Sequence, residues 1–277
     1  MIRAVESEAD LKLCARICRA VEEVSPPIHQ LRAVRERLLL DPHGGYAYVS
    51  HSSVAGTAYA MVRVLPERRR RGIGAALVEA AASAARELGH DKAWGYVQPG
   101  DDESLRFLSD RGFAEVGREV ELTRRVVRGE GAIPEGIHEI GEEHHVGAYA
   151  VSVAAVPDMA TAGAAEARAF DDWVEAELTS AAVAHVAIEH GAVVGYATLQ
   201  PTSDPTKLEH GFTGVLPEHR RRGLATALGR AQIAWAAEHG YEELFTTTGV
   251  PNTALRRQKA KLGYVEREGP ILVRAPV

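Results

Sequence analysis

The feature that most constrains this chain is an internal repeat with an offset of 151 residues. The segment VLPERRRRGIG at Val64–Gly74 recurs as VLPEHRRRGLA at Val215–Ala225. When residues 64–89 are aligned with residues 215–240, 14 of the 26 positions are identical. A repeat this long predicts a duplicated domain, and two copies of about 130 residues each are within the usual size of a domain.

The pattern of apolar residues predicts the same order of elements in both copies. An extended segment runs into the Leu-Pro-Glu turn, and the loop of arginines and glycine then opens a helix with apolar residues at helical spacing. Gly89 and Gly240 follow the last helical turns, where a left-handed C-cap is favoured. A strand, a helix, a glycine–aromatic pair and a final strand come next. The offset of 151 also holds for that pair, which is Gly112-Phe113 in one copy and Gly263-Tyr264 in the other.

The division of the chain follows from the repeat. We expect an N-terminal domain over residues 1–128, a linker rich in glycine over 129–136, and a C-terminal domain over 137–277. If Gly56 is aligned with Gly195, the first copy is 12 residues shorter before the Leu-Pro-Glu turn. We therefore expect the first copy to have lost most of a hairpin and to be degenerate.

Composition excludes several classes of protein. A net charge of −6 argues against nucleic-acid binding. No run approaches the roughly 20 apolar residues of a membrane helix, and the acidic N-terminus does not resemble a signal peptide. We expect a cytoplasmic protein in which Cys14 and Cys18 are buried free thiols, with no metal site because no metal-ligand spacing occurs.

The repeated loop has the chemistry of a diphosphate site. The first turn of a helix exposes unpaired N–H groups at the positive end of the helix dipole. Glycine lets a phosphate approach the backbone, and arginines add charged hydrogen bonds. The two common glycine-rich phosphate motifs, the P-loop and the dinucleotide-binding fingerprint, are absent from the sequence.

These residues resemble the acetyl-CoA signature of the GNAT superfamily of N-acyltransferases. The pattern Arg-x-x-Gly-x-Gly/Ala follows a Val-x-Pro-Glu segment and precedes a Gly-aromatic pair, and it occurs twice. The resemblance implies a mixed α/β (α+β) class with two tandem GNAT folds, each a mostly antiparallel sheet flanked by helices. It also implies that acetyl-CoA binds to the loop and to the preceding strand.

The resemblance assigns cofactor-binding positions in both copies. In the second copy these are Thr213, Gly214 and Val215 of the strand, and Arg220, Arg221, Arg222, Gly223, Leu224, Ala225 and Thr226 of the loop. In the first copy they are Val62 and Val64 of the strand, and Arg69, Arg70, Arg71, Gly72, Gly74 and Ala75 of the loop. Asn252 corresponds to a family asparagine that contacts the cofactor or caps the last helix; Asp101 is its counterpart in the first copy.

Acyl transfer needs a base to take the proton of the attacking amine. Glu209 shares one face of its predicted strand with Thr213 and is our first candidate, although it can equally be a surface carboxylate. His210 points the other way but titrates near neutral pH. Many family members have a tyrosine that acts as general acid, four residues before the glycine of the Gly-aromatic pair. In the second copy the residue four positions before Gly263 is Lys259, so Lys259 or solvent is the expected acid. Tyr264 is expected to lie in the core.

Two functions compete at this level. The first is an N-acetyltransferase that uses acetyl-CoA to modify a small-molecule amine in the C-terminal domain. The alternative is a non-catalytic protein that binds or senses acyl-CoA, because the tyrosine is missing. We expect no nucleic-acid or membrane partner, and a monomer or a homodimer.

Overall fold

The chain folds into two compact units. The computed structural model describes residues 2–22, 26–52, 54, 56–158 and 167–277. Unit 1 consists of Met1–Arg118 with Pro270–Val277, and unit 2 consists of Glu119–Gly269. The units therefore depart from the serial division expected at residues 128 and 137, and the expected linker 129–136 lies inside unit 2.

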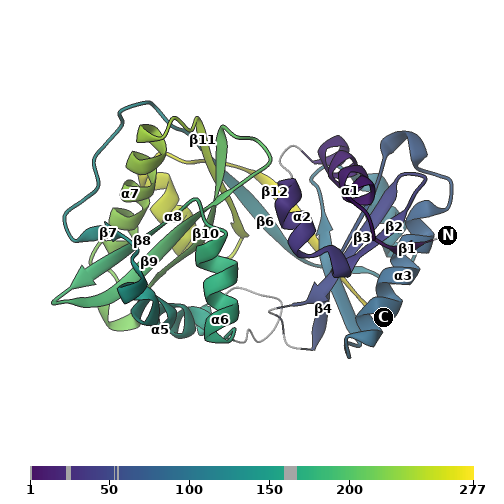
Figure 1. Ribbon diagram of the computed structural model, residues 1–277, viewed down its shortest axis with the longest axis horizontal. Helices are drawn as coiled ribbons and strands as arrows, with labels where there is room; N and C mark the ends of the chain where they lie inside the picture. Colours follow the sequence, from purple (N-terminus) through teal and green to yellow (C-terminus); the bar gives the residue numbers. More distant parts are fainter. Residues whose placement is uncertain (1, 23–25, 53, 55, 159–166) are drawn as a thin grey trace. The chain divides into compact units, whose positions relative to one another are not determined.

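Unit 1 has a mixed sheet whose strand order, within the described residues, is β1-β2-β3-β4-β5-β12. Figure 1 labels β1 to β4 and β12 of this sheet. Its strands are β1 (Arg3–Ala4), β2 (Leu38–Asp41), β3 (Gly45–His51), β4 (Thr57–Val64), β5 (Lys92–Val97) and the part of β12 (Val265–Pro276) that begins at Pro270. Its helices are α1 (Glu8–Val21), α2 (Ile28–Ala33), α3 (Ile73–Glu87) and α4 (Asp102–Ser109). The β4–β5 pair is parallel, and the other pairs are antiparallel.

Unit 2 repeats this plan with the strand order β7-β8-β9-β10-β11-β6. Its strands are the part of β6 (Ala114–Arg125) that begins at Glu119, β7 (Ile137–Glu139), β8 (Val183–Glu189), β9 (Ala192–Pro201), β10 (Lys207–Val215) and β11 (Glu243–Gly249). Its helices are α5 (His145–Ala155), α6 (Phe170–Trp173), α7 (Leu224–Glu238) and α8 (Thr253–Lys261). The β10–β11 pair is parallel, and the other pairs are antiparallel. The expected fold class, two mixed and mostly antiparallel sheets with flanking helices, is confirmed.

The last strands of the two repeats are exchanged. Strand β6 ends the first repeat in sequence, but it pairs with β11 of unit 2 from Glu119↔Gly249 to Arg125↔Glu243. Strand β12 ends the second repeat, but it pairs with β5 of unit 1 from Ile271↔Val97 to Pro276↔Lys92. Each sheet is therefore completed by a strand from the other repeat, which a sequence offset alone cannot reveal.

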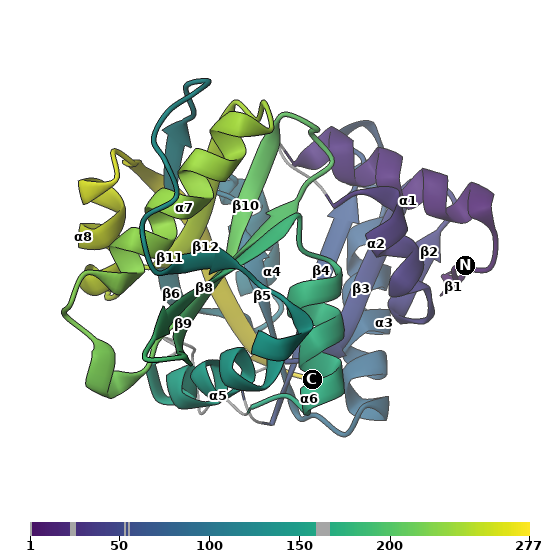
Figure 2. The same cartoon turned by 60° about the vertical axis from the view of Figure 1, so that its left-hand side comes forward.

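Helices cover both faces of the sheet in unit 2. Helices α5 and α6 pack on one face through Val151 and Trp173, which contact Val186 and Tyr196 of the sheet. Helix α7 packs on the opposite face through Leu228 and further apolar residues (Figure 2). Glycines in the left-handed conformation end the long helices as expected, with φ of 84° at Gly89 and 80° at Gly240.

The expected loss of a hairpin in the first copy is wrong. Strands β3 and β4 form a hairpin in which Gly45 pairs with Val64, just as Gly195 pairs with Val215 in the β9–β10 hairpin. Gly45 is thus the counterpart of Gly195, and Gly56 lies in the turn between β3 and β4. The misalignment arose because both glycines follow a short apolar stretch, and the register of the strands resolves it.

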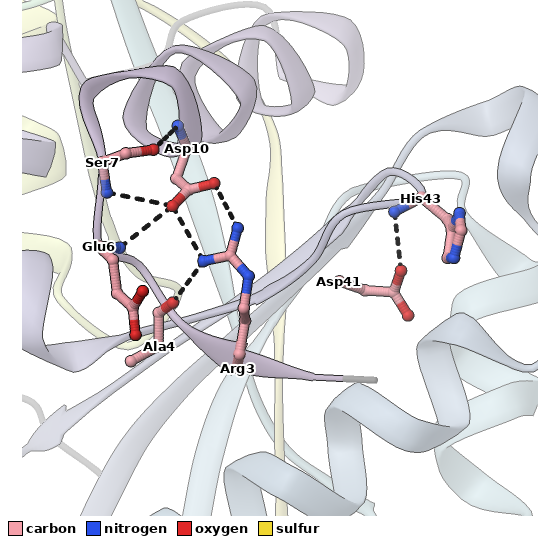
Figure 3. Close-up of polar contacts among 7 residues, drawn as sticks. All are labelled: Arg3, Ala4, Glu6, Ser7, Asp10, Asp41 and His43. Atoms are coloured by element: carbon pink, nitrogen blue, oxygen red, sulfur yellow. Dashed lines mark hydrogen bonds and ion pairs between the residues drawn. The ribbon is translucent and has the colours of Figure 1, made fainter.

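A polar cluster fixes the N-terminus of α1 against β1 (Figure 3). The carboxylate of Asp10 accepts hydrogen bonds from the Arg3 guanidinium at 2.7 and 2.9 Å and from the N–H groups of Glu6 and Ser7. The Ser7 hydroxyl in turn accepts from the Asp10 N–H, which completes a capping box. The Arg3 guanidinium is the main reason that the pKa of Asp10 lies well below its usual range.

The two cysteines are packed in the core of unit 1. Cys14 and Cys18 are free and buried, as expected, and burial is the first cause that raises the pKa of both thiols to about 12. Among the helices that the structure describes, none combines the length and apolar character needed to cross a membrane.

Candidate functional site

The repeated loop opens α3 and α7 in the same unusual way. Gly72 and Gly223 are the N-cap residues, and both are left-handed, with φ of 82° and 89°. Within the described part of the chain, no side chain caps either helix. A Cβ atom added at either glycine would meet no described heavy atom within 4 Å. The start of each helix is therefore open to a ligand.

The first turn of α7 presents donors to that open space. Its first backbone bond runs from the Ala227 N–H to the Gly223 carbonyl, at 2.9 Å. The N–H groups of the residues between them have no partner inside the helix, as at any helix N-terminus. Arg221 also has a positive φ of 61°, so the loop turns sharply just before the helix. Such a turn with exposed amides can hold a diphosphate.

Two of the three loop arginines in unit 2 are anchored. Arg220 donates through Nε to the Val215 carbonyl at 2.9 Å and pairs with the Asp158 carboxylate at 2.6 Å. Arg222 pairs with Glu189 at 2.8 Å, and His219 contacts the same carboxylate at 2.7 Å. These contacts fix the loop to the ends of β8 and β10.

Strand β10 loses one of its two partners halfway along its length. Its parallel pairing with β11 ends at Glu209↔Phe245, whereas its antiparallel pairing with β9 continues to Val215↔Gly195. A bulge interrupts the β9 pairing between His210 and Thr213. In the described chain, the edge of β10 beyond Glu209 therefore has no ladder partner on the β11 side. Such an edge can bind the amides of an extended ligand as an added strand would.

Glu209 lies where this edge begins. Burial raises its pKa to about 7, with smaller contributions from the charges of Glu119 and Glu121 on β6. The register places these three carboxylates on one face of the sheet, because side chains alternate along each strand and Phe245 pairs with Thr123. A carboxyl with such a pKa can exchange a proton near neutral pH.

His210 and Lys259 lie in the core rather than at this edge. His210 is 4% exposed, and its Nε2 contacts the Tyr264 hydroxyl at 2.5 Å. Lys259 is 1% exposed, with its Nζ 4.8 Å from the centre of the Tyr264 ring. Burial lowers the pKa of both side chains. This burial argues against the roles expected for His210 as base and Lys259 as acid, whereas the expected core position of Tyr264 is confirmed.

Asn252 caps α8, since its Oδ1 accepts a hydrogen bond from the Leu255 N–H at 3.2 Å. Asp101 caps α4 in the same way, with the Ser104 N–H as donor at 3.0 Å. The capping role is confirmed for both residues, and a contact between Asn252 and the cofactor stays a prediction.

A pocket that the sequence did not indicate lies on the Glu209 face of the sheet. Its volume is about 360 Å³, and its lining is Arg168, Ala176, Glu177, Gln200, Gly211 and Phe212. Gln200 pairs with Glu209 in the β9–β10 ladder, so the pocket adjoins the candidate base. The lining residues have no motif of their own; Gln200, Gly211 and Phe212 are near Glu209 in the sequence, whereas Arg168, Ala176 and Glu177 come from a distant segment that carries no signal.

The matching place in unit 1 is built differently. Strand β4 pairs with β5 in parallel as far as Tyr59↔Trp94, so Tyr59 takes the position of Glu209. The β3–β4 register is continuous from Gly45 to His51, without a bulge. Arg63, the counterpart of Gly214 in the repeat, forms a buried ion pair with Glu22 of the segment after α1. Unit 1 has the loop but lacks the carboxylate and the bulge in this part of the structure.

Comparison with models of known protein families identifies the family of this chain. The profile of the acetyltransferase (GNAT) family matches residues 36–113 and 150–264, which together exceed half of the chain. The chain therefore belongs to the GNAT family, and it is a tandem GNAT protein. A search of the curated proteins found no match.

Solved structures show the same tandem fold. A GCN5-related N-acetyltransferase from Sphaerobacter thermophilus is 19% identical, with a TM-score of 0.73 over 100% of this chain and 95% of the other. A tandem GNAT protein from the clavulanic acid biosynthesis pathway is 20% identical, with a TM-score of 0.72 over 100% and 97%. A GCN5-related N-acetyltransferase from Kribbella flavida is 19% identical, with a TM-score of 0.59 over 95% of each chain. At these identities the likeness concerns the fold.

Proposed function

We propose that unit 2 transfers an acetyl group from acetyl-CoA to the amine of a small molecule. The observation that carries this proposal is the edge of β10, which loses β11 at Glu209 and leads to the helix opened by Gly223. Three features thus follow one another within the 16 residues from Glu209 to Leu224: a carboxyl with a raised pKa, a strand edge that can bind the donor, and an open helix start.

The residues present fit acetyl-CoA. The amides at Leu224–Thr226 and the guanidinium of Arg221 suit a diphosphate, and the open space at Gly223 admits it. The backbone of Thr213–Val215 suits the amides of pantetheine. When bound, the thioester supplies the activated acetyl group.

Glu209 is the base in this proposal. The attacking nitrogen must lose a proton as its bond to the acetyl carbon forms, and the carboxylate accepts that proton directly or through a water molecule. N–H groups along the bulged part of β10 can stabilise the negative charge on the acetyl oxygen. The CoA thiolate leaves and takes a proton from solvent, which this proposal favours over the buried Lys259 as the acid.

A second candidate is a protein that binds acyl-CoA without turnover. The burial of Lys259, at the position of the family's tyrosine acid, favours this candidate. We also propose that the loop of unit 1, Arg69–Ala75 with strand positions Val62–Val64, binds CoA without transferring its acyl group, because Tyr59 replaces the base.

The Glu209→Gln variant separates the two candidates. Release of free CoA thiol is measured with acetyl-CoA and a panel of amines, and binding is measured by the thermal shift that acetyl-CoA causes. We expect turnover to fall by about 10²-fold or more with the thermal shift unchanged. Exposed Glu175→Gln is the control and should keep full turnover. A thermal shift without CoA release from any amine in the wild type would favour the sensor.

A further inference from the structure

The exchange of strands gives the two units different chemistry at equivalent positions. In unit 2, Glu121 of β6 pairs with Thr247, and Glu119 pairs with Gly249. In unit 1 the position equivalent to Glu121 is held by Leu272, which pairs with Tyr96. The part of β12 that joins unit 1, Pro270–Val277, contains no carboxylate residue. The first repeat therefore supplies an acidic strand to the unit that also contains Glu209.

Glu119 is a partly buried residue with one unused carboxylate acceptor. Within the described chain, its Oε2 is buried and has no hydrogen-bond partner. Burial raises the pKa of this carboxyl, and a hydrogen bond with Thr247 partly offsets the effect. A buried polar atom without a partner is uncommon in native proteins, and a bound molecule can complete its hydrogen bonding.

Glu119 lies on the same face of the sheet as Glu209. Both side chains lie on the α5 face of the sheet, on the two sides of β11, and the charge of Glu119 acts on Glu209. The 360 Å³ pocket opens on this face beside Gln200 and Gly211. Its one lining guanidinium, Arg168, is paired with Glu177 at 3.3 Å and so does not offset the carboxylates of the strands.

We propose that unit 2 selects aliphatic amines that bind as cations, and that Glu119 of the exchanged strand is the residue that selects them. This inference rests on the transferase proposed above. An aliphatic amine has a pKa of about 10.4 and arrives as an ammonium ion. Glu119 binds the ammonium group, or a second one on the same molecule. The attacking ammonium first loses one proton to water, and Glu209 takes the second proton from the nitrogen as the C–N bond forms. An acceptor with its own carboxylate is repelled by the carboxylates of Glu119 and Glu209.

The test compares three kinds of acceptor with the full chain and acetyl-CoA: an aliphatic diamine, an amino acid with an equally long side-chain amine, and an arylamine that is neutral at pH 7. In the wild type we expect the diamine to have the lowest KM. In Glu119→Gln we expect the KM for the diamine to rise about tenfold, with kcat and the KM for acetyl-CoA changed by less than about threefold. The KM for the arylamine should not change.

Two variants control for folding and for charge. Glu115→Gln removes an exposed carboxylate near the start of the same strand and should leave the KM for the diamine unchanged. Glu119→Asp keeps the charge and should recover most of the lost affinity. An unchanged KM in Glu119→Gln, or an amino acid as the best acceptor, would overturn the selection of cations.

The two proposals fail in different ways. If the wild type acetylates the arylamine but not the diamine, the transferase stands and the role of Glu119 is refuted. If no amine releases CoA while acetyl-CoA still stabilises the chain, the transferase is refuted and the inference about its acceptor with it.

Discussion

Glu209 of β10 and Tyr59 of β4 hold the same position in the two units: each is the last residue at which its strand pairs with the parallel neighbour. The neighbours at this point, Phe245 and Trp94, are 151 residues apart, as the repeat requires. One unit thus places a carboxylate at the start of the open strand edge, and the other places an aromatic ring there. The Tyr59 ring packs 5.0 Å from the ring of Trp94, measured between centres. At the open strand edge, the two units differ in this residue and in the bulge of β10.

The pH profile of turnover should show the ionisation of Glu209. A base acts as its carboxylate, and burial raises the pKa of this carboxyl to about 7. We expect kcat/KM to fall about tenfold per pH unit below pH 7 and to level off above it. The measurement is CoA release at saturating acetyl-CoA from pH 5 to pH 9. A fall of kcat/KM with its midpoint near pH 4.5 would contradict the raised pKa. The residual activity of Glu209→Gln should not show this fall at low pH.

Gly223→Glu should abolish the stabilisation of unit 2 by acetyl-CoA. The substitution places a negative side chain in the open space at the helix start and forces a residue with a Cβ into φ of 89°. The backbone strain alone costs about 1 kcal/mol. Gly240→Glu is a matched control, because Gly240 is also left-handed and open but ends α7 instead of beginning it. Both variants should lose similar stability, and only Gly223→Glu should lose CoA release.

The same substitution at Gly72 tests unit 1. If its loop binds CoA, Gly72→Glu should remove one of two sites counted by isothermal titration while turnover persists, since Tyr59 leaves unit 1 without a base. A single site in the wild type, lost in Gly223→Glu and kept in Gly72→Glu, would show that the unit 1 loop does not bind the donor.

How far the sequence predicts this molecule depends on the range of the interactions involved. The loop, the helix it opens and the glycines that end the helices are local features, so the repeat of residues 64–89 predicted them in both units. Register and strand exchange depend on contacts between distant segments. The sequence therefore misaligned Gly56 with Gly195 and missed that β6 belongs to unit 2. His210 and Lys259 suggested acid–base chemistry by residue type alone, and only the packing around Tyr264 reveals their burial.

Protonation of a buried histidine should destabilise unit 2 in acid. His185 is fully buried, its two ring nitrogens have no hydrogen-bond partner among the described residues, and burial lowers its pKa to about 4. The unfolded chain binds a proton near pH 6.5, so the stabilising effect of the neutral ring is complete above that pH and is lost as pH falls toward 4. Between these values, the free energy of unfolding should fall by up to about 1.4 kcal/mol per pH unit more in the wild type than in His185→Leu. Urea unfolding at a series of pH values measures this difference, and parallel curves for the two proteins would refute it.

The strand exchange predicts which fragment of the chain folds. A fragment of residues 119–269 contains β7 to β11 and the part of β6 that pairs with β11, whereas residues 137–277, the second repeat as the sequence divides it, lack β6. Strand β6 buries Val120 and Leu122 to 8% and 2% exposure, and the loss of two such side chains costs roughly 3–6 kcal/mol out of a typical 5–15. We expect the 119–269 fragment to unfold cooperatively and to be stabilised by acetyl-CoA, and the 137–277 fragment to be largely unfolded at 37 °C. Circular dichroism and thermal shifts measure both properties. Equal unfolding midpoints for the two fragments would contradict this prediction. They would mean that unit 2 is stable when β11 has no partner in place of β6.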